Sequence, residues 1–384
     1  MQRGILLLIT PIILLVGCGK HEVRDPMEFT LPEATARQEL TLAKDILYKA
    51  HPSINLYKSK ERVDFLFDSI YQTFTQRTSL RKFYNSLYFI TNEFGCSHTD
   101  LFMPPSFYDT LRNRNYFFPF PVLWVGNKML VNIADFDTPQ GTEIVSINGQ
   151  PVKQLLKEIS LYNSVEGIHR PTQLSLACRD FSFQYYLKFG PQKKFNLQII
   201  DTSGKAKTLS LDPINYSEWE TRNSSYIYYF DGTAVDYDFI LNNEKGYGLI
   251  RIPTFEFGNG QKQSAFEHFC SNTFELLQKK ANIKTLIIDL RENTGGKLYA
   301  AFLLFSYLAK KPFTEYERVI SKVNSLPYSS YLDKDFAERE KAGLETSLRD
   351  EFEKRKTGPY YYYDSSFINK WEPDKYRLME MYLL

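Results

Sequence analysis

The pattern of apolar and polar positions predicts helices in the first third of the chain. Leu40 and Leu47 lie at helical spacing on one face, and a second apolar helical run covers residues 80–94 directly after Ser79, a residue type that caps helices. We therefore predict an N-terminal helical domain of two or three helices over residues 33–103.

Shorter apolar runs separated by turn residues follow, as is typical of strands. Three of them, FPFPVLWV, KMLVNIADF and GTEIVSINGQPVKQLLKEI, lie between residues 117 and 160, and the last contains the turn signal Asn148-Gly149 before a short helix. A helical segment at 171–189 and two further strands complete this region. We predict a β-rich domain over residues 104–215.

The pattern changes again near residue 247. A strand at 247–255, a helix at 261–280, an apolar strand at 285–290 and a helix at 297–310 follow one another. This order is typical of a parallel sheet that is covered by helices on both faces. The predicted fold class is therefore multi-domain α/β, and the last domain covers residues 216–384.

The first residues, MQRGILLLITPIILLVGCGK, form a leader rather than part of a domain. Arg3 precedes an apolar run of about a dozen residues, whereas a permanent membrane helix needs roughly 17. The run ends in LVGC, which resembles the bacterial lipobox, in which Cys18 is lipidated after cleavage. We predict a lipoprotein signal peptide at 1–17 and a tether at 18–32. The alternative is an ordinary signal peptide with a chance cysteine.

Composition narrows the function classes. The chain has 47 Lys plus Arg and 45 Asp plus Glu, and its formal charge of +2 is too small for nucleic-acid binding. Beyond the leader only Cys96, Cys178 and Cys270 occur, without a zinc-type spacing, so we expect buried thiols, no disulfide framework, no metal and no cofactor.

The string TLIIDLRENTGGK raises the question of what Gly295 and Gly296 do between a strand and a helix. A phosphate loop is excluded because neither glycine-rich phosphate motif is present. A purely structural turn explains one glycine but gives no role to Asp289, Arg291 and Asn293. A third interpretation is an oxyanion hole made of backbone N–H groups, with Asp289, Arg291 and Asn293 orienting the loop.

LIIDLRENTGG also resembles the D-x-R-x-N-x-G-G motif of the S41 serine peptidases, the family of tail-specific proteases and of the tricorn core. GLIRIPTF is similar to the family's first core strand, and FGCSHTDL resembles its G-D-G-H-T segment. GTEIVSINGQPV resembles the carboxylate-binding loop of a PDZ domain, although any hairpin followed by a helix could give this pattern. The resemblance covers residues 33–310 in the family's order.

The resemblance assigns roles to individual residues. Gly295 and Gly296 match the positions that supply the oxyanion hole, and His98 matches the general base of tricorn-like members. Ser97 matches the serine that orients the catalytic groups there, although many members have glycine at this position. The chain has Cys96-Ser97 where Asp-Gly is commoner. His98 could instead be a turn residue that binds backbone.

Other conspicuous side chains are predicted to be structural. His21 lies in the tether, His51 at a helix end and His268 within a helix. The four tyrosines at 360–363 are expected in a strand or loop that is half buried.

The family places its nucleophilic serine in a string like V-x-L-x-N-x-x-T-x-S-A, and no such string occurs in this sequence. Ser365 and Ser366 precede the segment WEP instead of following a strand. We interpret residues 378–384 (LMEMYLL) as the product of a one-nucleotide deletion after Arg377, because deleting one T from codons for FNGNVFI, a string typical of similar proteins, can give them. The peptidase core is therefore expected to be truncated, with an open sheet edge.

Two functions follow. The first is a serine-type peptidase of the bacterial envelope, held to the membrane by its lipid and acting on polypeptides, but inactive in this chain for want of the serine. The second is a lipid-anchored binding protein for polypeptides or apolar ligands.

Overall fold

The computed structural model describes residues 24–133, 138–167, 169–224, 237–257, 260–291, 293, 295–325, 327–331, 356–358, 360–363 and 368–372. They form two compact units. The first unit holds the described residues up to 224 together with 321–331, and the second holds 237–320 and those from 356 onward.

Several predictions fall outside the described residues. They concern the signal peptide at 1–17, the lipidation residue Cys18, His21, the serines Ser365 and Ser366, and residues 378–384.

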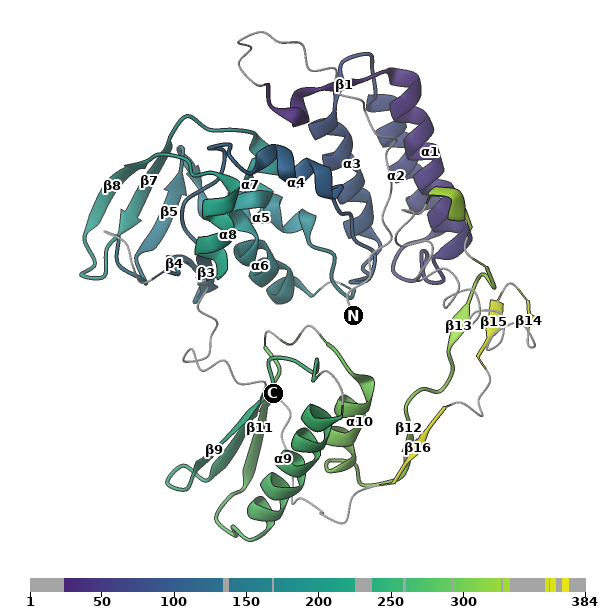
Figure 1. Ribbon diagram of the computed structural model, residues 1–384, viewed down its shortest axis with the longest axis vertical. Helices are drawn as coiled ribbons and strands as arrows, with labels where there is room; N and C mark the ends of the chain where they lie inside the picture. Colours follow the sequence, from purple (N-terminus) through teal and green to yellow (C-terminus); the bar gives the residue numbers. More distant parts are fainter. Residues whose placement is uncertain are drawn as a thin grey trace. The chain divides into compact units, whose positions relative to one another are not determined.

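Three α-helices lie side by side near the start of the first unit, within residues 33–93 (Figure 1). They are α1 (Glu33–Ala50), α2 (Lys60–Thr73) and α3 (Leu80–Glu93). Ser79 caps α3 by accepting a hydrogen bond from the Lys82 N–H, as its position in the sequence predicted. The helical prediction is confirmed.

The tether prediction is wrong for its last residues. The short helix η1 (Pro26–Glu28) and strand β1 (Thr30–Leu31), which pairs with β2 (Thr78–Ser79), are part of the fold. Met27 is fully buried, and the buried Asp25 carboxylate accepts a hydrogen bond from the Tyr186 hydroxyl at 2.7 Å. It also forms an ion pair with Arg81. A buried carboxylate needs such partners, so these contacts fix the segment.

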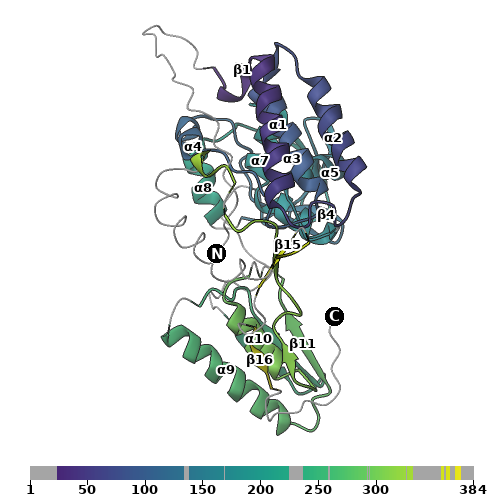
Figure 2. The ribbon, with the colours of Figure 1, turned by 90° about the vertical axis from the view of Figure 1, so that its right-hand side faces the viewer.

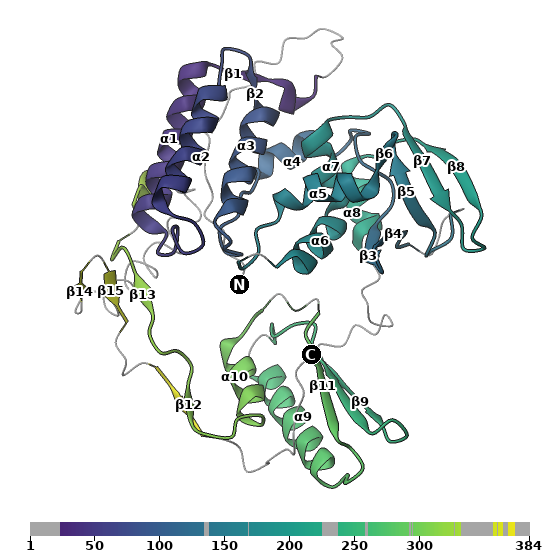
Figure 3. The same ribbon diagram turned by 180° about the vertical axis from the view of Figure 1, so that it is seen from behind.

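The β-rich part of the first unit is one antiparallel sheet of order β3-β4-β5-β7-β8, with β6 added beside β5 (Figure 3). Its strands are β3 (Val122–Val125), β4 (Lys128–Val131), β5 (Glu143–Ile147), β6 (Gln150–Pro151), β7 (Phe195–Ile200) and β8 (Ala206–Leu211). Asn148 (φ 48°) and Gly149 (φ 79°) form the predicted turn between β5 and β6. The prediction of a β-rich region is confirmed.

Helices α5 (Val152–Ile159), α6 (Arg170–Arg179) and α7 (Phe181–Phe189) bury their apolar residues against this sheet. The single helix predicted at 171–189 is thus two helices. They separate at Asp180 (φ −106°, ψ 20°), because a short polar side chain favours non-helical backbone.

The remaining helices of the first unit were not predicted. They are α4 (Pro105–Leu111), α8 (Tyr216–Ser224) and the single turns η2 (Ser160–Tyr162) and η3 (Ser329–Tyr331). Leu111, Tyr216 and Trp219 join the core formed by α1, α2 and α3. Their short apolar patterns acquire a buried face only in this tertiary setting.

The second unit contains the predicted order of strand, helix, strand and helix. Strand β10 (Tyr247–Arg251) pairs in parallel with β11 (Thr285–Asp289), while α9 (Gln261–Gln278) and α10 (Leu298–Ser306) lie against each other on one face of the sheet (Figure 2). An additional strand, β9 (Asp238–Asn242), pairs antiparallel with β10 and was not predicted.

Strand β9 thus forms one edge strand of this sheet. Among the described strands, β11 pairs only with β10. Ile240, Leu249 and Ile287 lie in register on the sheet face away from the core, and Ile240 is 40% exposed.

Short strands close the described chain: β12 (Phe313–Thr314), β13 (Ile320–Ser321), β14 (Lys356–Thr357), β15 (Tyr360–Tyr362) and β16 (Lys370–Trp371). The tyrosines of β15 are half buried, as predicted.

No helix within the described residues is both long and apolar enough to cross a membrane.

Candidate active site

The turn between β11 and α10 is locked against the chain that follows β10. The Phe255 N–H donates to the Gly295 carbonyl, and the Lys297 N–H donates to the Phe255 carbonyl, both at 2.9 Å. A Cβ at Gly296 would lie 2.2 Å from the Phe255 carbonyl carbon. Gly295 (φ 101°) and Gly296 (φ 136°) also have backbone angles that favour glycine. Both glycines are therefore required by this turn, for different reasons.

Asp289 and Arg291 form a bidentate pair at the start of the turn. The Arg291 Nη2 lies 2.7 Å from Asp289 Oδ2, and the Arg291 backbone N–H donates to Asp289 Oδ1 at 3.1 Å. Burial of the Asp289 carboxyl raises its pKa, but the hydrogen bonds from Arg291 outweigh this effect, so the pKa is lowered overall. The carboxylate therefore stays charged and holds the backbone of the turn.

Asn293 connects the turn to the strand next to it. Its Nδ2 donates to the Ile252 carbonyl at 2.9 Å, and its Oδ1 accepts the Gly295 N–H at 2.8 Å. The Gly295 amide is thus engaged within the loop in this conformation, which narrows the predicted oxyanion donors to Gly296.

The Gly296 N–H has no hydrogen-bond partner within the described part of the chain. It lies directly before Lys297, the N-cap of α10, so the positive end of the helix dipole adds to the field at this amide. A free amide in a rigid turn at a helix start is suited to binding a developing anion.

The loop that carries His98 is joined to a second loop by a pair of glycines. The Gly167 N–H donates to the Gly95 carbonyl at 2.8 Å, and a Cβ at Gly95 (φ 62°) would meet the Gly167 carbonyl oxygen at 2.8 Å. The two backbones can approach this closely because position 95 has no side chain. Glu166 is thereby held beside Ser97 and His98.

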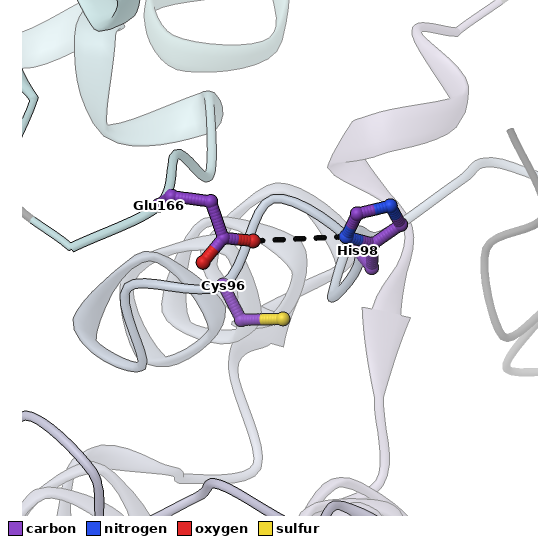
Figure 4. Close-up of side chains that lie close together, drawn as sticks. All are labelled: Cys96, His98 and Glu166. Atoms are coloured by element: carbon purple, nitrogen blue, oxygen red, sulfur yellow. Dashed lines mark ion pairs between the residues drawn. The ribbon is translucent and has the colours of Figure 1, made fainter. Parts of the chain in front are cut away.

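Ser97, His98 and Glu166 form a polar cluster. The Ser97 hydroxyl donates to Glu166 Oε1 at 2.8 Å and lies 3.3 Å from His98 Nδ1, while the Ser97 N–H donates to the same Oε1 at 3.1 Å. His98 Nδ1 is 3.6 Å from Glu166 Oε1, and the side chains of His98 and Glu166 are 82% and 62% exposed (Figure 4). The loop therefore offers an accessible imidazole beside a carboxylate.

Sequence reasoning missed Glu166. It lies 69 positions after Ser97 and belongs to no motif. Contacts between the two segments, among them the hydrogen bond of Gly167 to Gly95 and that of the Asn92 side chain to the Asn163 carbonyl, bring it to the cluster.

His51 supports the same loop from the interior. The Ser53 N–H donates to His51 Nδ1 at 3.2 Å, so Nε2 carries the ring proton and donates to Thr99 Oγ1 at 2.8 Å. Burial of His51, followed by the charge of Lys322, lowers its pKa below the usual 6.5, against a smaller opposing effect of Glu166. The neutral ring thus anchors the residue that follows His98.

The predicted site residues fall into two groups. Ser97 and His98 belong to the first unit, and Asp289, Arg291, Asn293, Gly295 and Gly296 belong to the second. Within each unit the residues of the group lie together.

The cysteines differ from one another. Cys178 and Cys270 are buried as expected, and burial raises the pKa of the Cys270 thiol to about 12. Cys96 is only half buried, because it lies on the exposed loop next to Ser97. The expectation of a buried thiol is wrong for this residue.

A glycine turn that presents a free amide at a helix start is typical of enzymes that stabilise oxyanions. Residues 246–359, which include this turn, match the family model described as Peptidase family S41. This match agrees with the resemblance of the chain's motifs to the S41 peptidases and supports it.

Several solved structures are similar to the chain at low sequence identity. A crystal structure of a CPAF mutant is 15% identical, covers 73% of this chain and 60% of its own, and has a TM-score of 0.49. Mature CPAF is 15% identical, with coverages of 82% and 66% and a TM-score of 0.45. The photosystem II D1 C-terminal processing protease is 14% identical, with coverages of 76% and 67% and a TM-score of 0.29.

The chain spans 60% of the length of the first of these structures. No curated protein matches it.

We expect substitution of Gly295 and of Gly296 to lower the free energy of unfolding by different amounts. Gly295→Ala meets no atom within 4 Å and carries only backbone strain, about 1–3 kcal/mol. Gly296→Ala carries similar strain and also collides with the Phe255 backbone, so it should lower the free energy of unfolding further. Urea unfolding of the two full-length variants measures this. An equal or smaller loss for Gly296→Ala would contradict the contact.

Acidification should destabilise the protein through His51. Because its pKa is lowered in the folded state, the unfolded chain takes up the proton first as the pH falls. This contribution to the free energy of unfolding is complete above about pH 6.5 and decreases as the pH falls toward the folded pKa. Urea unfolding at about pH 7.5 and about pH 5.5 should show a smaller pH dependence in His51→Gln than in the native chain. Identical pH dependence would show that His51 does not titrate in this way.

Proposed function

We propose that this chain carries two parts of a serine-peptidase site, a general base at His98 and an oxyanion donor at Gly296. The observation that carries the proposal is the Gly296 amide, which has no partner among the described residues and lies in a turn within the S41 match. The polypeptide substrate is proposed from the family, because acyl transfer from a peptide creates the oxyanion that this amide would bind.

The polar cluster supports His98 as the base. If the Nδ1–H donates to Ser97 Oγ, the Ser97 hydroxyl in turn donates a hydrogen bond to Glu166 Oε1, as the 2.8 Å contact allows. The neighbouring carboxylate favours the proton on Nδ1, which leaves the lone pair on Nε2 to accept a hydroxyl proton. Ser97 and Glu166 would thus position the ring and set its tautomer.

We propose that this chain lacks the serine nucleophile of the family. The proposal is supported by the sequence, in which no string resembles the family's nucleophile segment. On this proposal the 384-residue chain itself is inactive.

The PDZ-like region suits capture of a polypeptide. Strand β3 lies at an edge of its sheet, and α6 lies beside it. An extended peptide can add to such an edge through backbone hydrogen bonds. We propose this edge as the place where a substrate chain is held.

Lipidation at Cys18 and a place in the bacterial cell envelope belong to the same proposal. They are supported by the lipobox-like string before Cys18.

A fluorophosphonate probe tests the peptidase. We expect no labelling of the chain as it stands and serine labelling of a chain whose frame is restored after Arg377. In the restored chain, His98→Ala should slow labelling on the order of 100-fold or more, as expected for loss of a general base. His268→Ala is the matched control, because His268 is also exposed and, within the described residues, its ring contacts the Ser264 carbonyl of its own helix.

Labelling of the original chain would contradict the absence of the nucleophile. No labelling of either chain would contradict the peptidase and favour a binding protein for polypeptides or apolar ligands. Equal effects of His98→Ala and His268→Ala would remove His98 from the mechanism.

If Cys18 is lipidated, its substitution should remove the protein from the membrane fraction. In a bacterial host the native chain should incorporate labelled palmitate and sediment with membranes, whereas Cys18→Ser should do neither. Cys96→Ser is the matched control and should behave as the native chain, because Cys96 lies in the folded first unit. Membrane sedimentation of Cys18→Ser, or palmitate incorporation that survives it, would contradict the anchor.

A further inference from the structure

Three side chains of types that commonly bind metal ions lie close together at the His98 loop. They are the Cys96 thiol, the His98 imidazole and the Glu166 carboxylate, and their ligating atoms all lie within 4.8 Å of one another (Figure 4). Among the described residues this is the one such group of three. Two of the three come from a single turn, and the third comes from the loop joined to it by Gly95 and Gly167.

The backbone fixes the spacing of the three ligands. The hydrogen bond from Gly167 to Gly95 holds the two loops together, and the Ser97 N–H holds the Glu166 carboxylate at 3.1 Å. The His98 and Glu166 side chains are mostly exposed and can turn toward a shared ion. A site whose backbone is already placed loses less entropy on binding than one that must be assembled.

We propose that Cys96, His98 and Glu166 bind a divalent cation of the zinc type, with the fourth position left to water. A thiolate, an imidazole and a carboxylate form bonds to Zn²⁺ of about 2.3, about 2.0 and about 2.1 Å. Ligand atoms around such an ion are roughly 3–4 Å apart. Movements of the three ligand atoms by about 1 Å, through side-chain rotation, would bring them to these separations. The sulfur and nitrogen ligands favour Zn²⁺ over Mg²⁺ and Ca²⁺, which prefer oxygen.

The other thiols and imidazoles of the described chain are arranged differently. Cys178 and Cys270 are buried. The exposed His169 contacts Thr172 at 2.7 Å, and His268 contacts the Ser264 carbonyl, also at 2.7 Å. None of these side chains belongs to a group of three ligands.

Binding at this site has a consequence that rests on the proposed function. A neutral imidazole has one lone pair for a metal or a proton. His98 Nδ1 is the ring nitrogen near Glu166, at 3.6 Å, so a metal on Nδ1 leaves the proton on Nε2. The ring then cannot accept a proton from a serine hydroxyl. Zn²⁺ would therefore inhibit the peptidase by occupying its base.

Metal titration of the full chain carrying Cys18→Ser tests the site, since this background removes the thiol of the leader. Co²⁺ should bind at one equivalent and give the near-ultraviolet charge-transfer band of a thiolate ligand, and Zn²⁺ should displace it. Cys96→Ser should abolish that band. His98→Ala and Glu166→Gln should each weaken Zn²⁺ binding, measured by competition with a chromophoric chelator, by roughly 10-fold to 100-fold or more.

His169→Ala is the matched control, because it removes an exposed imidazole three residues after Glu166 and should leave the affinity unchanged. Unfolding midpoints of the metal-free variants separate loss of a ligand from loss of fold. Absence of stoichiometric binding, or binding that persists in Cys96→Ser and Glu166→Gln, would overturn the site.

The readout is metal binding alone. A chain that binds Zn²⁺ but is never labelled by the fluorophosphonate refutes the peptidase and leaves the metal site standing. A chain that is labelled but binds no Zn²⁺ refutes the metal site and leaves the peptidase standing.

Discussion

The second unit depends on one close backbone contact, that of Gly296 with Phe255. Two hydrogen bonds of Phe255 hold the turn after β11 against the chain after β10, and they can form only because position 296 has no Cβ. Because β10 and β11 are parallel, the segments that follow them leave the sheet at the same end, that of the strands' carboxyl termini. The contact then fixes the start of α10 and leaves one amide of the turn without a partner in the described chain.

The first unit uses the same physical device for a different purpose. Gly95 lets the Gly167 backbone approach, and this approach brings side chains together instead of presenting an amide. In both units a glycine allows two distant segments to touch through their backbones. The chemistry is therefore placed by rigid main chain, which tolerates less displacement than side-chain packing would.

Much of this fold could be predicted from periodicity. The helices α1 and α3, the turn at Asn148 and the alternation from β10 to α10 follow from local patterns that tertiary structure did not override. The strand β9 and the helices α4 and α8 could not be predicted, because their patterns are short and their stability comes from neighbours. The burial of Asp25 could not be predicted either. A carboxylate in a polar segment is expected to be exposed, and its partners Arg81 and Tyr186 are distant in the sequence.

The site shows the same division. The motif located Asp289, Arg291, Asn293 and both glycines, but it could not reveal that Asn293 engages the Gly295 amide. That bond depends on the fold of the loop, and it distinguishes two glycines that the sequence treats as equivalent. Glu166 was invisible for a different reason, because its role comes from a contact between distant loops.

The departure from the commoner Asp-Gly at positions 96 and 97 can now be given a physical meaning. A glycine at 97 could not connect the His98 ring to a carboxylate, whereas the Ser97 hydroxyl lies between His98 Nδ1 and Glu166. An aspartate at 96 would place a second negative charge beside Glu166, whereas a thiol adds a softer ligand without that repulsion at neutral pH. On the proposals above the two residues act together, because the Ser97 hydroxyl would orient the ring and the Cys96 thiol would complete a set of three metal ligands. On the two proposals made above, the loop would have two states, one in which His98 acts as a base and one in which a metal ion binds it.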